Sequence, residues 1–289
     1  METGWAKINL TLEILGKRPD GYHELSSLVV FAALGDRLHL TPGSGFSLEV
    51  TGPYADAIEG ENLIEKVART LKERHGAKNI GSVLLEKLLP VASGVGGGSA
   101  DAGAFLRLYQ RFSGVSFSQA DVQGFGRTFG ADVPVCTWSR PVLMGGIGEE
   151  MAPLCSLPDM ALLLVNPGVA VSTRAVFDEL GAPLLDEAQS PPSLKAPVFS
   201  DFEDVVAYMQ GHGNDLTVPA MGLAPVIGDV LGALSGLPGC AFARLSGSGA
   251  TCFGVFPGLE MAAQAALTLK KMQPAWWIAP AAVRPVVSF

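Results

Sequence analysis

The sequence has few positive charges and no long apolar run. Its 20 lysines and arginines stand against 28 acidic residues, which gives a formal charge of −8 and a pI near 5.0. Nucleic-acid binding relies on lysine and arginine to neutralise phosphates, so nucleic acid is a poor candidate partner. No apolar run approaches the roughly 20 residues that cross a bilayer, and the first residues lack a signal-peptide pattern. We therefore expect a cytoplasmic protein that binds neither nucleic acid nor membrane.

Cysteine is also scarce, with four residues in the whole chain and no CxxC pair. This spacing argues against a disulfide scaffold and against a zinc site. The four histidines form no HExxH pattern either. We expect the cysteines to be small buried thiols; they are Cys136, Cys155, Cys240 and Cys252.

Apolar residues are abundant, at 48% of the chain, whereas charged residues make up 17%. A chain of 289 residues is long for one core, because domains typically hold about 100–200 residues. A proline-containing stretch at 156–158 suggests the boundary, so we predict domains at 1–155 and 156–289. Both halves mix strands with helices, which predicts an α+β protein rather than a doubly wound sheet.

The periodicity of the apolar residues predicts the main elements. Strict alternation predicts a half-buried strand from Lys7 to Glu13, with Lys7 and Asn9 on the same face. Residues 181–200, rich in proline, serine and alanine, are expected to form a long loop. Helices are expected at 62–75, 99–111, 118–129 and 173–180, and further strands at 28–32, 36–40, 46–50, 82–89, 142–144, 161–165 and on both sides of a turn within 244–256.

The strongest motif is a glycine-rich loop, PVASGVGGGSADA, at residues 90–102. Four glycines in the five positions from Gly94 to Gly98 precede the helix predicted at Ser99. Phosphate oxygens can approach a backbone without side chains, and the helix N-terminus adds a positive dipole end. A surface turn without a ligand is the simpler alternative, but so many glycines are costly unless the backbone must be accessible. The loop lacks the lysine of a P-loop and the spacing of a Rossmann fingerprint.

A second motif is the segment Gly130–Pro134, in which Asp132 precedes a rigid Val-Pro pair. Such an aspartate can take the proton from a hydroxyl nucleophile. Alone the motif is weak, since a helix- or turn-capping aspartate explains it equally well. Lys7 is the candidate partner that keeps this carboxylate ionised and stabilises phosphoryl charge, although a solvated lysine is the simpler interpretation.

A third motif is the small-residue segment Arg244–Thr251, with the sequence RLSGSGAT between two apolar stretches. It is suited to lying under another backbone or beside a phosphate. An ordinary β-turn explains it as well.

These three motifs occur in the order of the three signatures of the GHMP kinases, which the sequence resembles. More narrowly, the chain resembles the family of 4-diphosphocytidyl-2-C-methyl-D-erythritol kinases from about residue 5 to residue 256. The most discriminating match is the run Lys17–His23. The other matching segments are Ala6–Leu10, Gly94–Ala102, Gly130–Pro134, Asn166–Gly168, Val171–Thr173, Asn214–Leu216 and Arg244–Ala250. In the loop, Ala92 and Ser93 occupy positions where relatives often carry glycine or other small residues.

The resemblance implies a two-domain GHMP kinase fold, with an N-terminal ATP-binding α+β domain of the type seen in a ribosomal protein's second domain and a C-terminal ferredoxin-like domain. It implies transfer of the γ-phosphoryl group of ATP to the 2-hydroxyl group of a cytidine-diphosphate-linked methylerythritol, in non-mevalonate isoprenoid synthesis. Asp132 would be the base and Lys7 its charged partner.

The remaining roles implied by the resemblance concern the two substrates. Pro90, Gly94, Val95, Gly96, Gly97, Gly98 and Ser99 would hold the phosphates of ATP, with Mg²⁺ neutralising them and Ser99 as a weak candidate for its contact. His23 would hydrogen-bond the cytosine, Tyr22 and Phe177 would offer it aromatic faces, and Asn9 and Thr173 would lie near the substrate. By themselves, Tyr22 and His23 form a polar-aromatic pair after a turn, and Phe177 is by default a core residue.

Three alternatives remain open at this point. One is another GHMP kinase acting on homoserine, mevalonate or a sugar, which has no need of a cytosine pocket. Another is an ATP-using diphosphate decarboxylase, which would release carbon dioxide. The last is a nucleotide-binding protein without turnover, against which the presence of both Lys7 and Asp132 argues. We expect a monomer or a weak homodimer.

Overall fold

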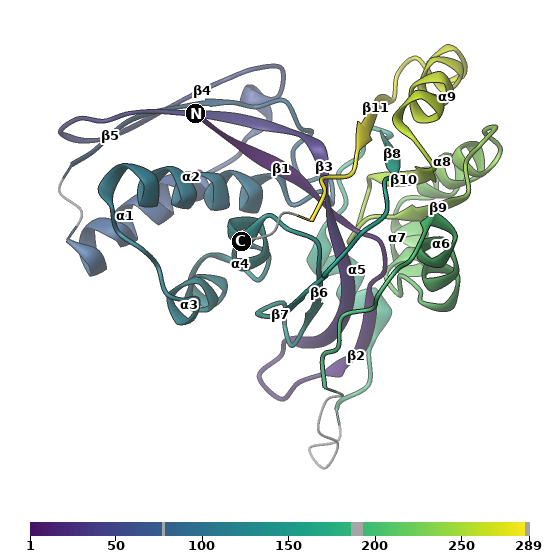
Figure 1. Cartoon of the computed structure of the whole chain (residues 1–289), viewed down its shortest axis with the longest axis horizontal. Helices are drawn as coiled ribbons and strands as arrows, with labels where there is room; N and C mark the ends of the chain where they lie inside the picture. Colours follow the sequence, from purple (N-terminus) through teal and green to yellow (C-terminus); the bar gives the residue numbers. More distant parts are fainter. Residues whose placement is uncertain (77–78, 186–192, 287–289) are drawn as a thin grey trace. The chain divides into compact units, whose positions relative to one another are not determined.

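The computed structural model describes residues 1–76, 79–185 and 193–286 (Figure 1). The chain divides into two compact units, each assembled from separate stretches of sequence. This division differs from the single boundary predicted after residue 155, because residues 8–33 and 92–95 pack with the later part of the chain. The first unit comprises Met1–Lys7, Leu34–Val91 and Gly96–Ser139; the second comprises Ile8–Ala33, Ala92–Val95 and Arg140–Phe289.

The first unit contains a sheet built around a β–α–β crossover. Strands β4 (Gly45–Thr51) and β5 (Asn79–Glu86) run parallel and are joined by α1 (Leu63–His75), after a 3₁₀ turn at Ala55–Ala57. The later part of β3 (His23–Thr41) pairs antiparallel with β5. Strand β1 (Glu2–Asn9) also pairs with β3.

Helices cover one face of this sheet (Figure 1). They are α1, α2 (Gly97–Ser113), α3 (Gln119–Phe129) and α4 (Val133–Trp138). Their apolar residues form one core with those of the strands, in which Leu38, Leu85 and Phe105 are fully buried. Burying a side chain of this size stabilises a fold by about 1.5–3 kcal/mol.

Capping residues set the ends of two of these helices where the sequence predicted them. Asn62 and Glu65 form a capping box at the start of α1, and Gly76 ends that helix in the left-handed conformation. Ser118 and Asp121 form a second box at the start of α3. Aspartate therefore replaces the usual glutamate there without loss of the reciprocal hydrogen bonds.

The second unit contains a four-stranded antiparallel sheet in the order β11–β8–β10–β9. With helices between β8 and β9 and again between β10 and β11, this is the strand order of a ferredoxin-like domain, as the resemblance implied. Its strands are β8 (Ala161–Asn166), β9 (Phe242–Leu245), β10 (Cys252–Phe256) and β11 (Trp277–Ala282); its helices are α5 (Thr173–Leu180), α6 (Phe202–Gly211), α7 (Thr217–Leu223), α8 (Val226–Ser235) and α9 (Leu259–Met272).

Further strands of the second unit lie along the first part of β3. Strand β2 (Glu13–Lys17) pairs antiparallel with it through a bulge, and β6 (Val142–Gly145) pairs with it on Ser27–Val29. Strand β7 (Glu150–Pro153) then pairs with β6. Leu12 belongs to the core of the ferredoxin-like sheet, so a residue near the start of the sequence completes a core formed mainly by residues after 160.

Several predicted elements need correction. The strand predicted from Lys7 to Glu13 is wrong, because β1 ends at Asn9 and the chain changes partner: Leu10 donates to Leu28, whereas Leu12 donates to Gly213. The prediction that this segment is half-buried is also wrong, since its polar and apolar faces are both buried. The strands predicted at 28–32 and 36–40 form one strand, β3.

One smaller prediction also changes, and another is confirmed for the described residues. Cys136 and Cys252 are buried, but Cys240 is half-buried and Cys155 is exposed. The loop predicted at 181–200 is free of helix and extended strand in 181–185 and 193–200, and its residues 186–192 lie outside the described part of the chain.

Candidate active site

The glycine-rich loop ends in the first turn of α2, two residues earlier than the helix start predicted at Ser99. Gly96 is the N-cap residue and is left-handed, with φ 63°, and no side chain caps this end of the helix. The first amides of an α-helix have no partner within the helix, so those of Gly97, Gly98 and Ser99 are available to an anion. The glycine turn therefore presents three backbone amides at one helix end.

The three glycines of this turn have different surroundings, so the reason for glycine differs among the positions. A Cβ at Gly96 would lie 3.3 Å from the Cβ of Lys7, and one at Gly97 would lie 3.2 Å from Lys87 Nζ. A Cβ at Gly98 would meet no heavy atom within 4 Å. Packing therefore explains Gly96 and Gly97, whereas at Gly98 the missing side chain leaves an open approach to the backbone.

Lys7 and Asp132 form an ion pair in the first unit, with Lys7 Nζ 2.7 Å from Asp132 Oδ1. The lysine side chain is 5% exposed and the aspartate side chain is 34% exposed, so one oxygen can reach a ligand while the cation is held inside. Asp132 precedes α4, but its side chain makes no capping hydrogen bond. The two simpler interpretations, a solvated lysine and a capping aspartate, are both wrong.

A half-buried arginine connects the elements that carry this pair. Arg107 donates to the carbonyls of Cys136 and Thr137 at the end of α4, at 2.6 and 3.2 Å, and to that of Thr3 in β1, at 2.8 Å. Lys7 lies in β1 and Asp132 begins α4. Nothing in the sequence pattern singles out Arg107, since a mid-helix arginine is usually a solvated side chain.

A second buried charge cluster underlies the glycine turn and was also missed. Lys87 Nζ donates to Asp36 and to Asp101, and all three residues are buried. The pKa of Lys87 is raised because the attraction of the two carboxylates outweighs the effect of burial. The only signal in the sequence is three charges next to apolar segments.

The segment Arg244–Thr251 lies against the start of the glycine loop within the second unit. The Ser246 hydroxyl donates to the Gly94 carbonyl at 3.0 Å, and the Thr251 amide donates to that of Ser93 at 3.0 Å. A Cβ at Gly94 would lie 2.6 Å from the Ser246 carbonyl oxygen, so no side chain fits there. The prediction that this turn lies under another backbone is confirmed.

Asn214 fixes the backbone of this turn through its side-chain amide. Its Nδ2 donates to the carbonyls of Leu245 and Gly247, at 2.8 and 2.9 Å, and its Oδ1 accepts from the Leu216 amide. The matching segment Asn214–Leu216 thus has a structural role that the sequence did not reveal.

Asn9 carries a buried oxygen without a partner. Its Nδ2 donates to Ser27 Oγ at 2.7 Å, and its backbone amide donates to Ser246 Oγ. Among the described residues its Oδ1 has no hydrogen-bond partner, although Asn9 is only 2% exposed. An unsatisfied buried acceptor is costly and therefore calls for an explanation.

Thr173 and Ser248 share a hydrogen bond of 2.8 Å between their hydroxyl groups in the second unit. His23 and Phe177 face each other with ring centroids 4.7 Å apart, and Tyr22 is exposed. Burial, assisted by the charge of Lys17, lowers the pKa of His23, so its imidazole is neutral at pH 7. A neutral imidazole both donates and accepts hydrogen bonds.

The predicted site residues therefore fall into two groups. Lys7, Asp132, Pro90 and Gly96–Ser99 belong to the first unit, and Lys7 contacts both Asp132 and the position of Gly96. The second group, in the second unit, consists of Asn9, Tyr22, His23, Gly94, Val95, Thr173 and Phe177. Within it, His23 contacts Phe177, whereas Val95 is fully buried.

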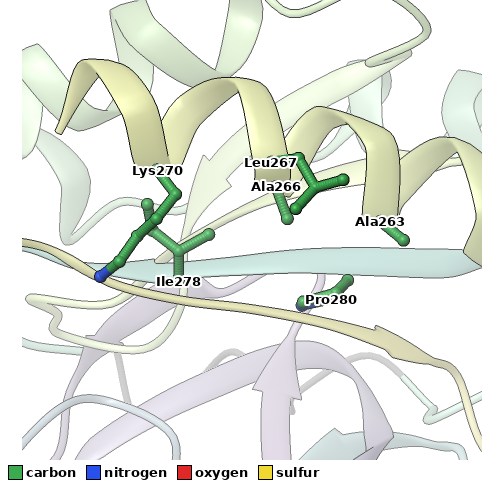
Figure 2. Close-up of a pocket in the computed structure, with 6 residues that line it drawn as sticks. All are labelled: Ala263, Ala266, Leu267, Lys270, Ile278 and Pro280. Carbon is green, nitrogen blue, oxygen red and sulfur yellow. The ribbon is translucent and has the colours of Figure 1, made fainter. Parts of the chain in front are cut away.

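A pocket of about 400 Å³ lies elsewhere, between α9 and β11 (Figure 2). Its lining is apolar apart from Lys270, whose ammonium group donates to the carbonyls of Pro274 and Trp276. It contains none of the predicted site residues; it is lined by Ala263, Ala266, Leu267, Lys270, Ile278 and Pro280.

Within 1–76, 79–185 and 193–286, no group of three or more histidine, cysteine, aspartate or glutamate side chains is arranged to hold a metal ion. No helix in that part of the chain is long and apolar enough to cross a membrane.

Comparisons with known proteins show the family of the chain. The family model of the GHMP kinases N terminal domain matches residues 62–140, and that of the GHMP kinases C terminal matches residues 192–275. A 4-diphosphocytidyl-2-C-methyl-D-erythritol kinase of Parvibaculum lavamentivorans is 48% identical over 279 residues, which cover 96% of each chain. One from Bradyrhizobium diazoefficiens is 44% identical over 287 residues, with the same coverage.

Solved structures show the same relationship. The crystal structure of a 4-(cytidine 5'-diphospho)-2C-methyl-D-erythritol kinase superposes over 100% of both chains with a TM-score of 0.73 and 31% identity. A homoserine kinase from Cytophaga hutchinsonii has a TM-score of 0.69 at 17% identity, over 98% of this chain and 93% of its own. At that identity the second match shows a shared fold.

Proposed function

The chain belongs to the 4-diphosphocytidyl-2-C-methyl-D-erythritol kinases of the GHMP superfamily, and we propose that it phosphorylates the 2-hydroxyl group of 4-diphosphocytidyl-2-C-methyl-D-erythritol. As a kinase of this family it uses ATP as the phosphoryl donor. The observation that carries the residue assignment is that Lys7, which pairs with Asp132, also lies beside the glycine turn, since a Cβ at Gly96 would be 3.3 Å from the Lys7 Cβ. A base, a cation and a phosphate cradle thus meet within one unit.

In the proposed step, Asp132 accepts the proton of the substrate hydroxyl as its oxygen attacks the γ-phosphorus. The bond between that phosphorus and the β–γ bridging oxygen breaks, and ADP leaves with its electron pair. Lys7 orients the carboxylate before the reaction, because its buried ammonium lies 2.7 Å from Asp132 Oδ1. The same ammonium stabilises negative charge that develops on the transferred group.

The glycine turn binds the phosphates in this proposal. The free amides of Gly97, Gly98 and Ser99 donate to phosphate oxygens, and the open side of Gly98 gives them room. Mg²⁺ supplies neutralisation of phosphate charge in phosphoryl transfer. The Ser99 hydroxyl, half-exposed in the first turn of α2, is the side chain that we propose for its contact.

Residues of the second unit bind the acceptor in this proposal. Asn9 Oδ1 lacks a donor, and a hydroxyl group of the methylerythritol supplies one. The neutral imidazole of His23 hydrogen-bonds the cytosine, and Tyr22 and Phe177 offer aromatic faces to the base. Thr173, whose hydroxyl is held by Ser248, lies near the substrate.

The test is ADP release with Mg-ATP and each candidate acceptor in turn. We expect release that depends on 4-diphosphocytidyl-2-C-methyl-D-erythritol, with none on homoserine, mevalonate or galactose and no carbon dioxide. If folded, ATP-binding protein releases no ADP with the cytidylyl compound, the substrate assignment is refuted. Carbon dioxide release from a diphosphate would instead identify a decarboxylase.

The catalytic assignment is tested by Asp132→Asn, which keeps the shape of the side chain. Losing a general base typically lowers the rate by about 10²–10⁴-fold, so kcat should fall by that factor while Mg-ATP binding is retained. Glu61→Gln is the matched control, because it breaks the exposed Arg69–Glu61 ion pair of the same unit. Wild-type kcat in Asp132→Asn would remove Asp132 from its role.

A further inference from the structure

The buried cluster Asp36–Lys87–Asp101 lies where the glycine loop begins and ends. Lys87 follows β5 and precedes Pro90, the first residue of the loop motif. Asp101 lies in α2, just beyond the glycine turn, with its Oδ2 2.7 Å from Lys87 Nζ. The ion pair therefore joins the two ends of the loop across 14 residues of sequence.

Asp36 adds a third attachment from β3. Its Oδ2 accepts from Lys87 Nζ, and its Oδ1 accepts from the amides of Leu88 and Leu89, the latter at 2.8 Å. One carboxylate thus fixes the backbone that leads into the loop, while the ammonium connects the same point to α2.

This arrangement is not the one that stability alone would select. Burying charges is costly, and apolar replacements of buried ion pairs are often neutral or stabilising. In the described part of the chain Asp101 Oδ1 has no hydrogen-bond partner, and burial raises the pKa of this carboxyl well above its usual range. What the charges provide is a directional connection, since Lys87 Nζ also lies 3.2 Å from where a Cβ at Gly97 would be.

We propose that Asp36, Lys87 and Asp101 form a buried clamp that fixes both ends of the glycine loop and so orders its amides for the phosphates of ATP. Lys87 and Asp101 are positioning residues in this proposal, because both are buried and act through the backbone of the loop. The proposal rests on the nucleotide-binding role given above to Gly97–Ser99. It does not depend on the identity of the acceptor.

The test is binding of Mg-ADP, followed by calorimetry, to Asp101→Ala and Lys87→Met. Asp101→Ala removes the link to α2 and leaves Lys87 and Asp36 as a neutral pair, so it is the variant expected to fold. Small misplacements of binding groups can cost about 10²-fold, and we expect Mg-ADP to bind about 10- to 100-fold more weakly to both variants. Asp101→Asn, whose Oδ1 still accepts from Lys87, should restore most of the affinity.

Two controls separate positioning from simple loss of stability. Glu86→Gln breaks the exposed Arg37–Glu86 pair next to Lys87 and should leave Mg-ADP binding unchanged. Leu71→Ala opens the core of the same unit and should lower the melting temperature without changing the dissociation constant. The KM for ATP should rise in Asp101→Ala while kcat at saturating ATP and the KM for the acceptor stay near wild type.

Wild-type affinity of folded Asp101→Ala for Mg-ADP would overturn the clamp. Equal weakening in Leu71→Ala would overturn it too, because instability alone would then explain the loss. A wild-type protein that binds Mg-ADP but does not phosphorylate the cytidylyl compound would refute the acceptor, and the clamp would still be tested by these variants. A wild type that binds no Mg-ADP would overturn both.

Discussion

Gly98 offers a substitution in which stability and function are expected to move in opposite directions. It lies in the first turn of α2, and a Cβ there would meet no heavy atom within 4 Å. Alanine is favoured over glycine in helices by up to about 1 kcal/mol. Because the position is near the helix end, we expect Gly98→Ala to raise the free energy of unfolding by about 0.5 kcal/mol.

The same methyl group would stand where the phosphate approaches. If it costs one hydrogen bond to a charged group, the loss is about 1.5–3 kcal/mol. At about 1.4 kcal/mol for each tenfold change, the KM for ATP should rise by about 10- to 150-fold. The KM for the acceptor should change little, because the first turn of α2 binds phosphates in the proposed mechanism.

The assay combines urea denaturation with steady-state kinetics on the same preparations. Gly124→Ala is the matched control, because Gly124 is an exposed glycine within α3 of the same unit and its Cβ would also meet nothing within 4 Å. It should stabilise the protein by up to about 1 kcal/mol and leave the KM for ATP unchanged. A Gly98→Ala enzyme with wild-type KM for ATP would show that the phosphates do not approach this turn.

Three further outcomes follow from single side chains. Arg107→Lys keeps the charge but loses the fork whose two arms hold carbonyls of α4 and the Thr3 carbonyl of β1. We therefore expect kcat to fall by about 10-fold in steady-state kinetics with the KM for ATP unchanged, and a rise in that KM alone would contradict this role. Ala92 has φ 51°, and Ala92→Gly should stabilise the fold by about 1 kcal/mol in urea denaturation, whereas destabilisation would contradict the strain argument. Because the pKa of His23 is lowered, its neutral form should persist as the pH falls to 6.5, histidine's ordinary pKa. The KM for the acceptor should therefore rise only below pH 6.5, and His23→Asn should abolish this pH dependence. A KM that rises between pH 7.5 and 6.5 would contradict a neutral imidazole.

Local signals were sufficient for most elements near the site. Asn62 and Gly76 predict the ends of α1, and Ser118 with Asp121 predicts the start of α3, because capping depends on residues close in sequence. The glycine loop and the Gly-Ser-Gly turn were recognisable for the same reason. The sequence predicted that the Gly-Ser-Gly turn would lie under another backbone. It did not identify Gly94 as the partner of Ser246, because the two residues are distant in sequence.

The parts that the sequence did not reveal depend on distant partners. Nothing within Lys7–Glu13 shows that the strand ends at Asn9, because the end is set by Gly213 accepting from Leu12. Arg107 and Lys87 resemble ordinary surface cations until the carbonyls and carboxylates around them are known. The predicted roles of the acceptor-binding residues come from the resemblance, and no local pattern distinguishes them from structural side chains.

The long strand β3 has a consequence for how such an enzyme can be cut or recombined. It runs without a break through 19 residues, of which 23–33 belong to one compact unit and 34–41 to the other. The chain also passes between the units after residues 7, 91, 95 and 139. A fragment ending at 155 would contain Leu12 without the sheet that buries it, and the remaining fragment would have a gap in its core. No single crossover between two genes can therefore exchange one unit intact.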